Sequence, residues 1–163
     1  MSGNDENTTS CIVDIVLDEK TVVRRGPEVE HERRVAVYDL LEENNFSLME
    51  GGEGPYSLHL SIEENRLVFD VRHHEEGDTL RRILLSLTPF RRLIKDYFMV
   101  CENYYDAIRT AAPGRIEAID VGRRALHDEG SRLLIDRLFG KVEVDFDTSR
   151  RLFTLICVLH IRG

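Results

Sequence analysis

The residues best suited to chemistry lie in the segment Asp120–Gly130, where charged side chains interrupt a helical apolar pattern. If this segment is one continuous helix, Arg123 falls within the apolar arc and His127, four residues later, falls at its edge. A charge on a buried face must be paired or must hold an anion, because an isolated buried ion costs several kcal/mol. Arg123 therefore has two interpretations.

The first interpretation is structural: an internal ion pair between Arg123 and a carboxylate such as Asp120 or Glu102, which we favour. The second is an anion-binding pocket for a phosphorylated or carboxylated metabolite. Its candidate basic residues are Arg33, Arg123, Arg124 and His127. The polar side chains that could line it or transfer protons are Tyr97, Glu102, Tyr104, Asp120 and Glu129.

The sequence contains no comparable motif for binding a metal ion or a cofactor. In His73–Glu76 the two histidines are adjacent, so on an extended chain they point to opposite sides and we expect a solvated turn. The glycines of Gly51–Gly54 precede a predicted strand rather than a helix, which disfavours a phosphate-binding loop. Cys11, Cys101 and Cys157 lack zinc or redox spacing and are typical of reduced core residues. We expect no metal and no cofactor.

Composition narrows the classes of partner. A formal net charge of -8 disfavours a general nucleic-acid binder. Arginine makes up 19 of the 22 basic residues, and its forked guanidinium suits phosphate or carboxylate, but composition does not locate a site. Met1–Ser10 has neither the basic nor the apolar segment of a signal peptide. The longest nearly apolar run, Leu152–Ile161, is about half the length that a membrane-spanning helix needs. The sequence therefore predicts a cytoplasmic protein that does not enter a membrane.

Three long helices are predicted to position these side chains. The clearest covers Thr88–Ala111, since Thr88 can cap the helix, Pro89 suits its first turn, and the apolar residues then recur at three- and four-residue steps. A second helix is predicted from Pro27 to about Asn44, and a third over Arg115–Phe139, with a possible interruption at Gly130. In the second helix the inner arc contains Val29, Arg33, Ala36, Val37, Leu40 and Leu41.

The strands predict an antiparallel sheet. Cys11–Leu17 is rich in β-branched residues, and the segments Tyr56–Ile62, Leu67–Val71 and Leu80–Leu87 form a three-stranded meander. Val142, Val144 and Phe146 alternate as a short strand, after which Asp147 could cap a last helix from Thr148 to about His160. That last segment is apolar on all sides, so periodicity cannot separate helix from strand; we favour helix.

These elements predict a single α+β domain over residues 10–163, after a disordered tail over residues 1–9. An antiparallel β-meander is expected to be covered by long amphipathic helices.

Several separated segments resemble a UPF-type family of small cytoplasmic bacterial proteins that is uncharacterised and has no assigned function. The segments that carry the resemblance are Val29–Arg33, Gly54–Leu58, Leu85–Pro89, Ile116–Arg124 and Val144–Thr148. The resemblance covers nearly the whole chain after the N-terminal tail. It implies no catalytic or binding residues that could be assigned to this sequence.

Three functions remain as hypotheses. The leading one is a non-catalytic interaction or regulatory module acting through a protein partner or self-association, because long amphipathic helices are present and no reaction centre is recognisable. The second is a small-molecule enzyme or sensor that uses the Arg/His pocket. The third is an RNA-binding accessory protein, supported only by the pairs Arg81-Arg82 and Arg91-Arg92.

Overall fold

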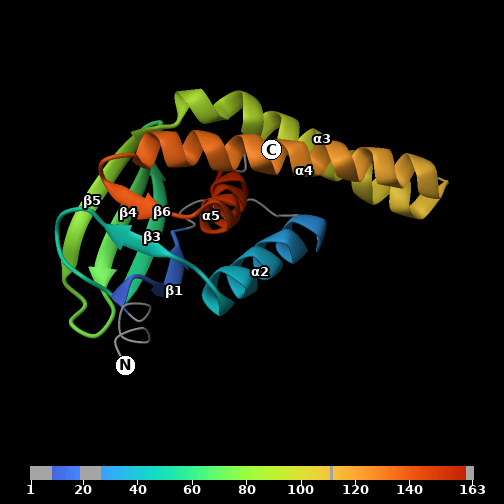
Figure 1. Cartoon of the computed structure of the whole chain (residues 1–163). Helices are drawn as coiled ribbons and strands as arrows, with labels where there is room; N and C mark the ends of the chain where they lie inside the picture. Colours follow the sequence, from blue (N-terminus) through green and yellow to red (C-terminus); the bar gives the residue numbers. More distant parts are fainter. Residues whose placement is uncertain (1–8, 19–26, 111, 161–163) are drawn as a thin grey trace.

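The computed structural model describes residues 9–18, 27–110 and 112–160 (Figure 1). Its strands are β1 (Ile12–Leu17), β2 (Phe46–Leu48), β3 (Tyr56–Glu63), β4 (Arg66–His73), β5 (Thr79–Ser86) and β6 (Val142–Val144). Its helices are α2 (Pro27–Glu42), the 3-10 turn η1 (Thr88–Phe90), α3 (Arg91–Thr110), α4 (Pro113–Leu138) and α5 (Phe146–Leu159). The chain is thus α+β, as the sequence predicts. Of the predicted tail, residues 1–8 lie outside the described residues, and the Thr9 carbonyl accepts a hydrogen bond from Gly54 N at 2.7 Å.

The main sheet has the strand order β1-β3-β4-β5. Strands β3, β4 and β5 form the predicted antiparallel meander, and Glu64 and Asn65 close the first hairpin with positive φ angles of 49° and 63°. Strand β1 pairs with β3 in parallel, with Ile15 opposite Leu58. The sheet is therefore mixed rather than purely antiparallel.

A second, two-stranded sheet joins β2 to β6 in antiparallel register, with Ser47 opposite Glu143. Strand β2 has only three residues, which is too short for an alternating pattern to reveal it. Phe146, expected in the β6 strand, is instead the first residue of α5.

The long helices follow the predicted pattern closely. The helix predicted over 88–111 is present as η1 and α3 up to Thr110, and Ala111 lies outside the described residues. Helix α2 ends at Glu42, two residues before the predicted end. Helix α4 continues through Gly130 without a break. The ring of Phe153 packs where a side chain at Gly130 would stand, so only glycine fits at this position. Gly130 thus marks close helix packing rather than an interruption.

The ambiguous last segment is helix α5, which packs against α2, α4 and strand β3 (Figure 1). Neighbours on several sides explain why its sequence is apolar all round. Its N-cap is Asp145, whose Oδ1 accepts a hydrogen bond from Thr148 N at 3.0 Å. The capping role predicted for Asp147 was wrong, because the helix begins two residues earlier than expected.

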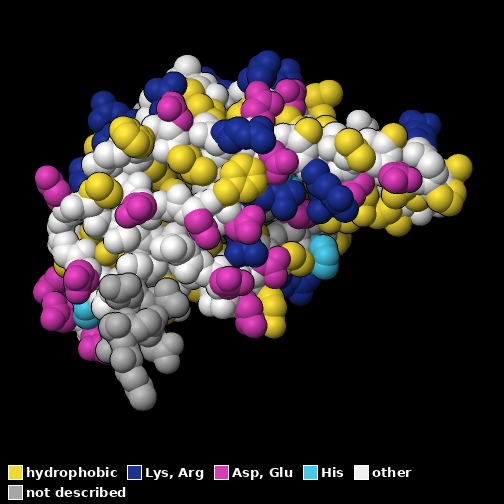
Figure 2. Space-filling view, in the orientation of Figure 1, with side chains coloured by type: hydrophobic (Ala, Val, Ile, Leu, Met, Phe, Trp, Pro, Cys, Tyr) yellow, Lys and Arg dark blue, Asp and Glu magenta, His cyan; other side chains and the backbone are white. Residues whose placement is uncertain are grey.

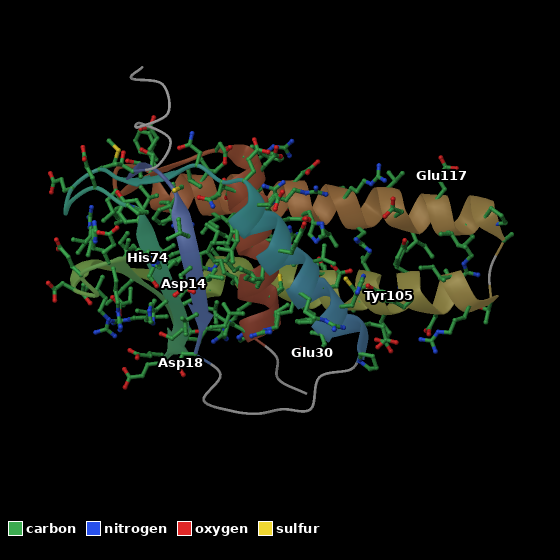
Figure 3. The ribbon with its side chains drawn as sticks, turned by 90° about the horizontal axis from the view of Figure 1, so that it is seen from below. Asp14, Asp18, Glu30, His74, Tyr105 and Glu117 are labelled. Atoms are coloured by element: carbon green, nitrogen blue, oxygen red, sulfur yellow. The ribbon has the colours of Figure 1, made fainter. Side chains whose placement is uncertain are left out.

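Helices α3 and α4 run antiparallel and project beyond the body of the molecule (Figures 1 and 3). We call residues 102–110 and 112–126 the arm. Buried residues of α4 begin only at His127, so the first half of that helix is mostly exposed and packs chiefly against α3. Hydrophobic side chains are visible along the arm and at its tip (Figure 2). Among the helices of the described ranges, none is both long and apolar enough to cross a membrane.

Candidate functional site

An ion pair at the base of the arm joins α4 to α2. Arg123 Nη1 lies 3.3 Å from Glu32 Oε1, and both side chains are largely withdrawn from solvent, with exposed fractions of 22% and 11%. The Tyr105 hydroxyl donates to Glu32 Oε1 at 2.9 Å, and the Arg123 guanidinium lies over the Tyr104 ring, 4.7 Å from its centre. The predicted internal ion pair is present, but its partner is Glu32 rather than Asp120 or Glu102.

Glu32 was missed because α2 turns a slightly different face inward than predicted. Its buried residues are Glu32, Ala36 and Leu40, at steps of four, whereas Leu41 is 39% exposed. The spacing of Glu32 from Ala36 and Leu40 is the signal that could have identified it. A carboxylate in that buried row also explains why Arg123 is tolerated on the inner face of α4.

His127 follows Arg123 by one helical turn and is buried. Its ring packs on the Tyr97 ring, with 5.2 Å between centres, and its Nδ1 lies 3.5 Å from Arg150 Nη2. Burial, reinforced by the nearby Arg150 and Arg123, lowers the pKa of His127 to about 4. The imidazole is therefore neutral at pH 7 and adds no positive charge to this cluster.

Two of the other candidates point outward. Arg124 pairs with Asp120 on its own helix at 2.9 Å, and the exposed Glu129 pairs with Arg92 at 3.1 Å. Arg33 is half-buried on α2. The structure thus brings Arg123, His127, Tyr97 and Tyr104 together but leaves Arg124 and Glu129 on the surface. An anion-binding role for these residues stays a prediction, and Arg123 already has an internal counter-ion.

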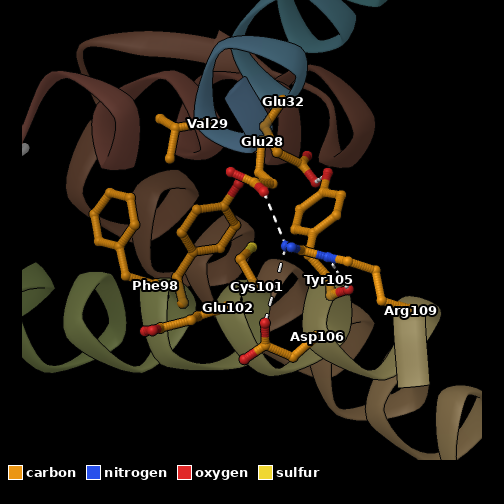
Figure 4. Close-up of a pocket in the computed structure, with 10 residues that line it drawn as sticks. Glu28, Val29, Glu32, Phe98, Cys101, Glu102, Tyr105, Asp106 and Arg109 are labelled. Carbon is orange, nitrogen blue, oxygen red and sulfur yellow. Dashed lines mark hydrogen bonds and ion pairs between the residues drawn. The ribbon is translucent and has the colours of Figure 1, made fainter. Parts of the chain in front are cut away.

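A cavity of about 390 Å³ lies beside this cluster, between α2 and α3 (Figure 4). Its lining residues are Glu28, Val29, Glu32, Tyr97, Phe98, Cys101, Glu102, Tyr105, Asp106 and Arg109. Arg109 lies between Glu28 and Asp106, at 3.2 and 3.9 Å from their carboxylates. Tyr97 and Glu102 are the two candidate pocket residues from the sequence that line this cavity.

Burial holds the thiol and the two phenols of the cavity wall in their protonated forms. Desolvation raises the pKa of the Cys101 thiol to about 11, and desolvation also raises the pKa of the Tyr97 and Tyr105 hydroxyls. At neutral pH Cys101 is thus a thiol rather than a nucleophilic thiolate, in line with the inert core role predicted for it. Within the described ranges, no group of three or more His, Cys, Asp or Glu residues is arranged to hold a metal ion.

Comparison with known proteins identifies close relatives over the full length of this fold. The model of an uncharacterised protein family, UPF0262, matches residues 9–162. A UPF0262 protein of Rhodopseudomonas palustris (strain BisB18) is 60% identical over 158 residues, covering 97% of this chain and 96% of the relative. A UPF0262 protein of Rhodospirillum rubrum is 58% identical over 163 residues, covering 100% of both chains. No solved structure matches this chain.

Proposed function

This chain belongs to UPF0262, an uncharacterised protein family. We propose that it is a non-catalytic interaction module that self-associates through the outer face of α4. A cytoplasmic location is part of this proposal. The observation that carries it is an exposed face of small and apolar residues on the arm. The members of this face, which we call the small-residue face, are Gly114, Ala118, Val121, Gly122 and Ala125.

The small-residue face lies opposite the side of α4 that contacts α3. Its residues recur at three- and four-residue steps, so they form one stripe, and Val121 is 62% exposed. A Cβ built on Gly122 would meet no atom of the described residues within 4 Å beyond its own helix backbone and its two chain neighbours. Glycine in a helix interior costs up to about 1 kcal/mol relative to alanine. No contact within the described chain accounts for that cost at Gly122, whereas close approach of a second helix does.

The charges beside this face favour a second copy of the chain as the occupant. Glu117 and Arg124 are both exposed and lie along the same edge of the stripe; Figure 3 shows Glu117 directed away from the body. Two α4 helices could pack antiparallel about a two-fold axis at Val121. Position 117 of one copy then lies opposite position 125 of the second copy, so Glu117 is next to Arg124 of that copy. The symmetry repeats this opposite-charge pair at the other end.

The state of the buried groups supports a binding rather than a catalytic role. The Cys101 thiol has a pKa raised to about 11, and the pKa of His127 is lowered to about 4, which makes it a weak base. His127 Nε2 is also enclosed, without a hydrogen-bond partner among the described residues.

Sedimentation velocity over a wide range of protein concentrations tests this proposal. We expect a dimer for the native chain, and a dissociation constant about fivefold higher for either Glu117→Arg or Arg124→Glu, because each places like charges opposite one another. The double variant should recover the native constant. Arg137→Glu, a charge reversal on the same helix outside the arm, is the matched control and should change nothing.

A monomer at the highest concentration reached would overturn the proposal. So would a double variant that dimerises no better than the two single variants, since that result removes the antiparallel pairing of a second copy. Gly122→Arg adds a second check: within the described part of the chain a side chain at that position has open space, so the variant should fold normally and fail to dimerise.

A further inference from the structure

The cavity between α2 and α3 contains a buried polar group that the protein itself does not satisfy. Tyr97 is 2% exposed and lines the cavity, yet its hydroxyl has no hydrogen-bond partner within the described part of the chain. Buried polar groups are nearly always paired, because an unpaired one loses its hydration without compensation. An unpaired hydroxyl at a cavity wall is therefore an available contact for a bound molecule.

The charge of the wall indicates which molecules would be favoured. Four carboxylates line the cavity, from Glu28, Glu32, Glu102 and Asp106, with the single guanidinium of Arg109. Arg123, behind Glu32, supplies one further positive charge. Four negative and two positive charges leave an excess of two negative charges, which disfavours an anion and favours a cation.

Part of the excess negative charge is at Glu102, because the other carboxylates of the wall are already paired. Arg109 is held by both Glu28 and Asp106 (Figure 4), and Glu32 is held by Arg123 and Tyr105. Glu102 forms no ion pair or hydrogen bond with any residue in the described ranges, although it lines the cavity. It is thus the carboxylate most available to an incoming positive charge.

We infer that this cavity binds a small organic cation, a primary amine carried on an aromatic or aliphatic body. The ammonium group would donate to the Tyr97 hydroxyl oxygen inside the cavity, and the exposed Glu102 at the rim would attract it electrostatically. Val29, Phe98 and the ring of Tyr105 provide apolar and aromatic wall for the body of the ligand. A volume of about 390 Å³ lies in the range of small-molecule pockets.

Isothermal titration calorimetry with three amines tests the inference: 2-phenylethylamine, agmatine and spermidine. We expect at least one of them to bind, and phenylacetate, which matches the first amine in size but is an anion, not to bind. Tyr97→Phe removes only the unpaired hydroxyl and should weaken binding about threefold. Glu102→Gln, at an exposed position that tolerates the change, should weaken it about fivefold.

Glu76→Gln is the matched control, since it removes an exposed carboxylate at a turn that neither lines the cavity nor belongs to the arm. Failure of all three amines to bind would overturn the inference. Equal binding of phenylacetate, or amine binding that neither variant weakens, would overturn it as well. Dimerisation through α4 is measured separately by sedimentation velocity. The calorimetry therefore tests only amine binding, and the sedimentation tests only self-association.

Discussion

Arg123 of α4 and Glu32 of α2 form an ion pair of 3.3 Å that ties the base of the arm to the body of the molecule. The two residues are 91 positions apart in the sequence. Tyr104 and Tyr105, adjacent on α3, complete the arrangement by stacking under Arg123 and by donating to Glu32. Three helices therefore meet at one charge pair.

Breaking one side of this pair should cost more than removing both sides. Arg123→Met leaves the Glu32 carboxylate largely buried beside Tyr105 alone, and we expect a loss of about 3 kcal/mol in the free energy of unfolding. The double variant Glu32→Gln, Arg123→Met should lose clearly less, because no uncompensated charge remains. Urea unfolding of the two single variants and the double variant measures this; strictly additive losses would show that the two charges do not interact.

Because His127 is buried in its neutral form, we expect the free energy of unfolding to fall as the solution becomes acidic. Its pKa is about 4 in the folded chain against an ordinary value of 6.5, so the unfolded chain takes up the proton first as the pH falls through 6.5 towards 4. Stability from this group is complete above about pH 6.5, and roughly 2 kcal/mol of it should be lost by pH 5.

Urea unfolding at pH 7.5 and pH 5, compared between the native chain and His127→Phe, isolates this contribution. The variant keeps an aromatic ring against Tyr97 and should lose less stability between the two pH values. His74→Gln, at an exposed turn position, is the control and should behave as the native chain. An unchanged pH dependence in His127→Phe would assign the acid sensitivity to other groups.

Two glycines of α4 should respond oppositely to alanine. A Cβ on Gly130 would overlap the ring of Phe153, whereas one on Gly122 has open space among the residues that the structure describes. We expect Gly130→Ala to destabilise the chain by about 1–3 kcal/mol and Gly122→Ala to stabilise its monomer by up to about 1 kcal/mol. Thermal unfolding at a concentration where the chain is monomeric compares them, and a stabilising Gly130→Ala would contradict the close packing of α4 on α5.

Two nearby aspartates have different roles at the start of α5. Asp145 caps the helix through Thr148 N, so Asp145→Ala should cost about 1 kcal/mol in the free energy of unfolding. Asp147 lies inside the first turn and contributes only through the helix dipole, so Asp147→Ala should cost a few tenths of a kcal/mol. Equal losses in the two variants, measured by urea unfolding, would contradict the assignment of the cap.

Local periodicity was sufficient for most of the fold. The stripe from Phe90 to Ile108 predicts one long helix, and the alternation and turns from Tyr56 to Leu87 predict the meander, because each depends on neighbours a few residues apart. The same reasoning recognised Arg123 as a charge on an inner face that needed a partner. These features follow from the sequence itself.

The partners across the fold were decided only by tertiary packing. Glu32 rather than Asp120 or Glu102 meets Arg123, because the inward face of α2 depends on how that helix packs against α5 and the arm. Packing likewise made the all-apolar segment Leu152–Leu159 a helix and placed β1 parallel to β3. Contacts between distant segments depend on which faces the whole chain buries together, and a local pattern does not contain that information.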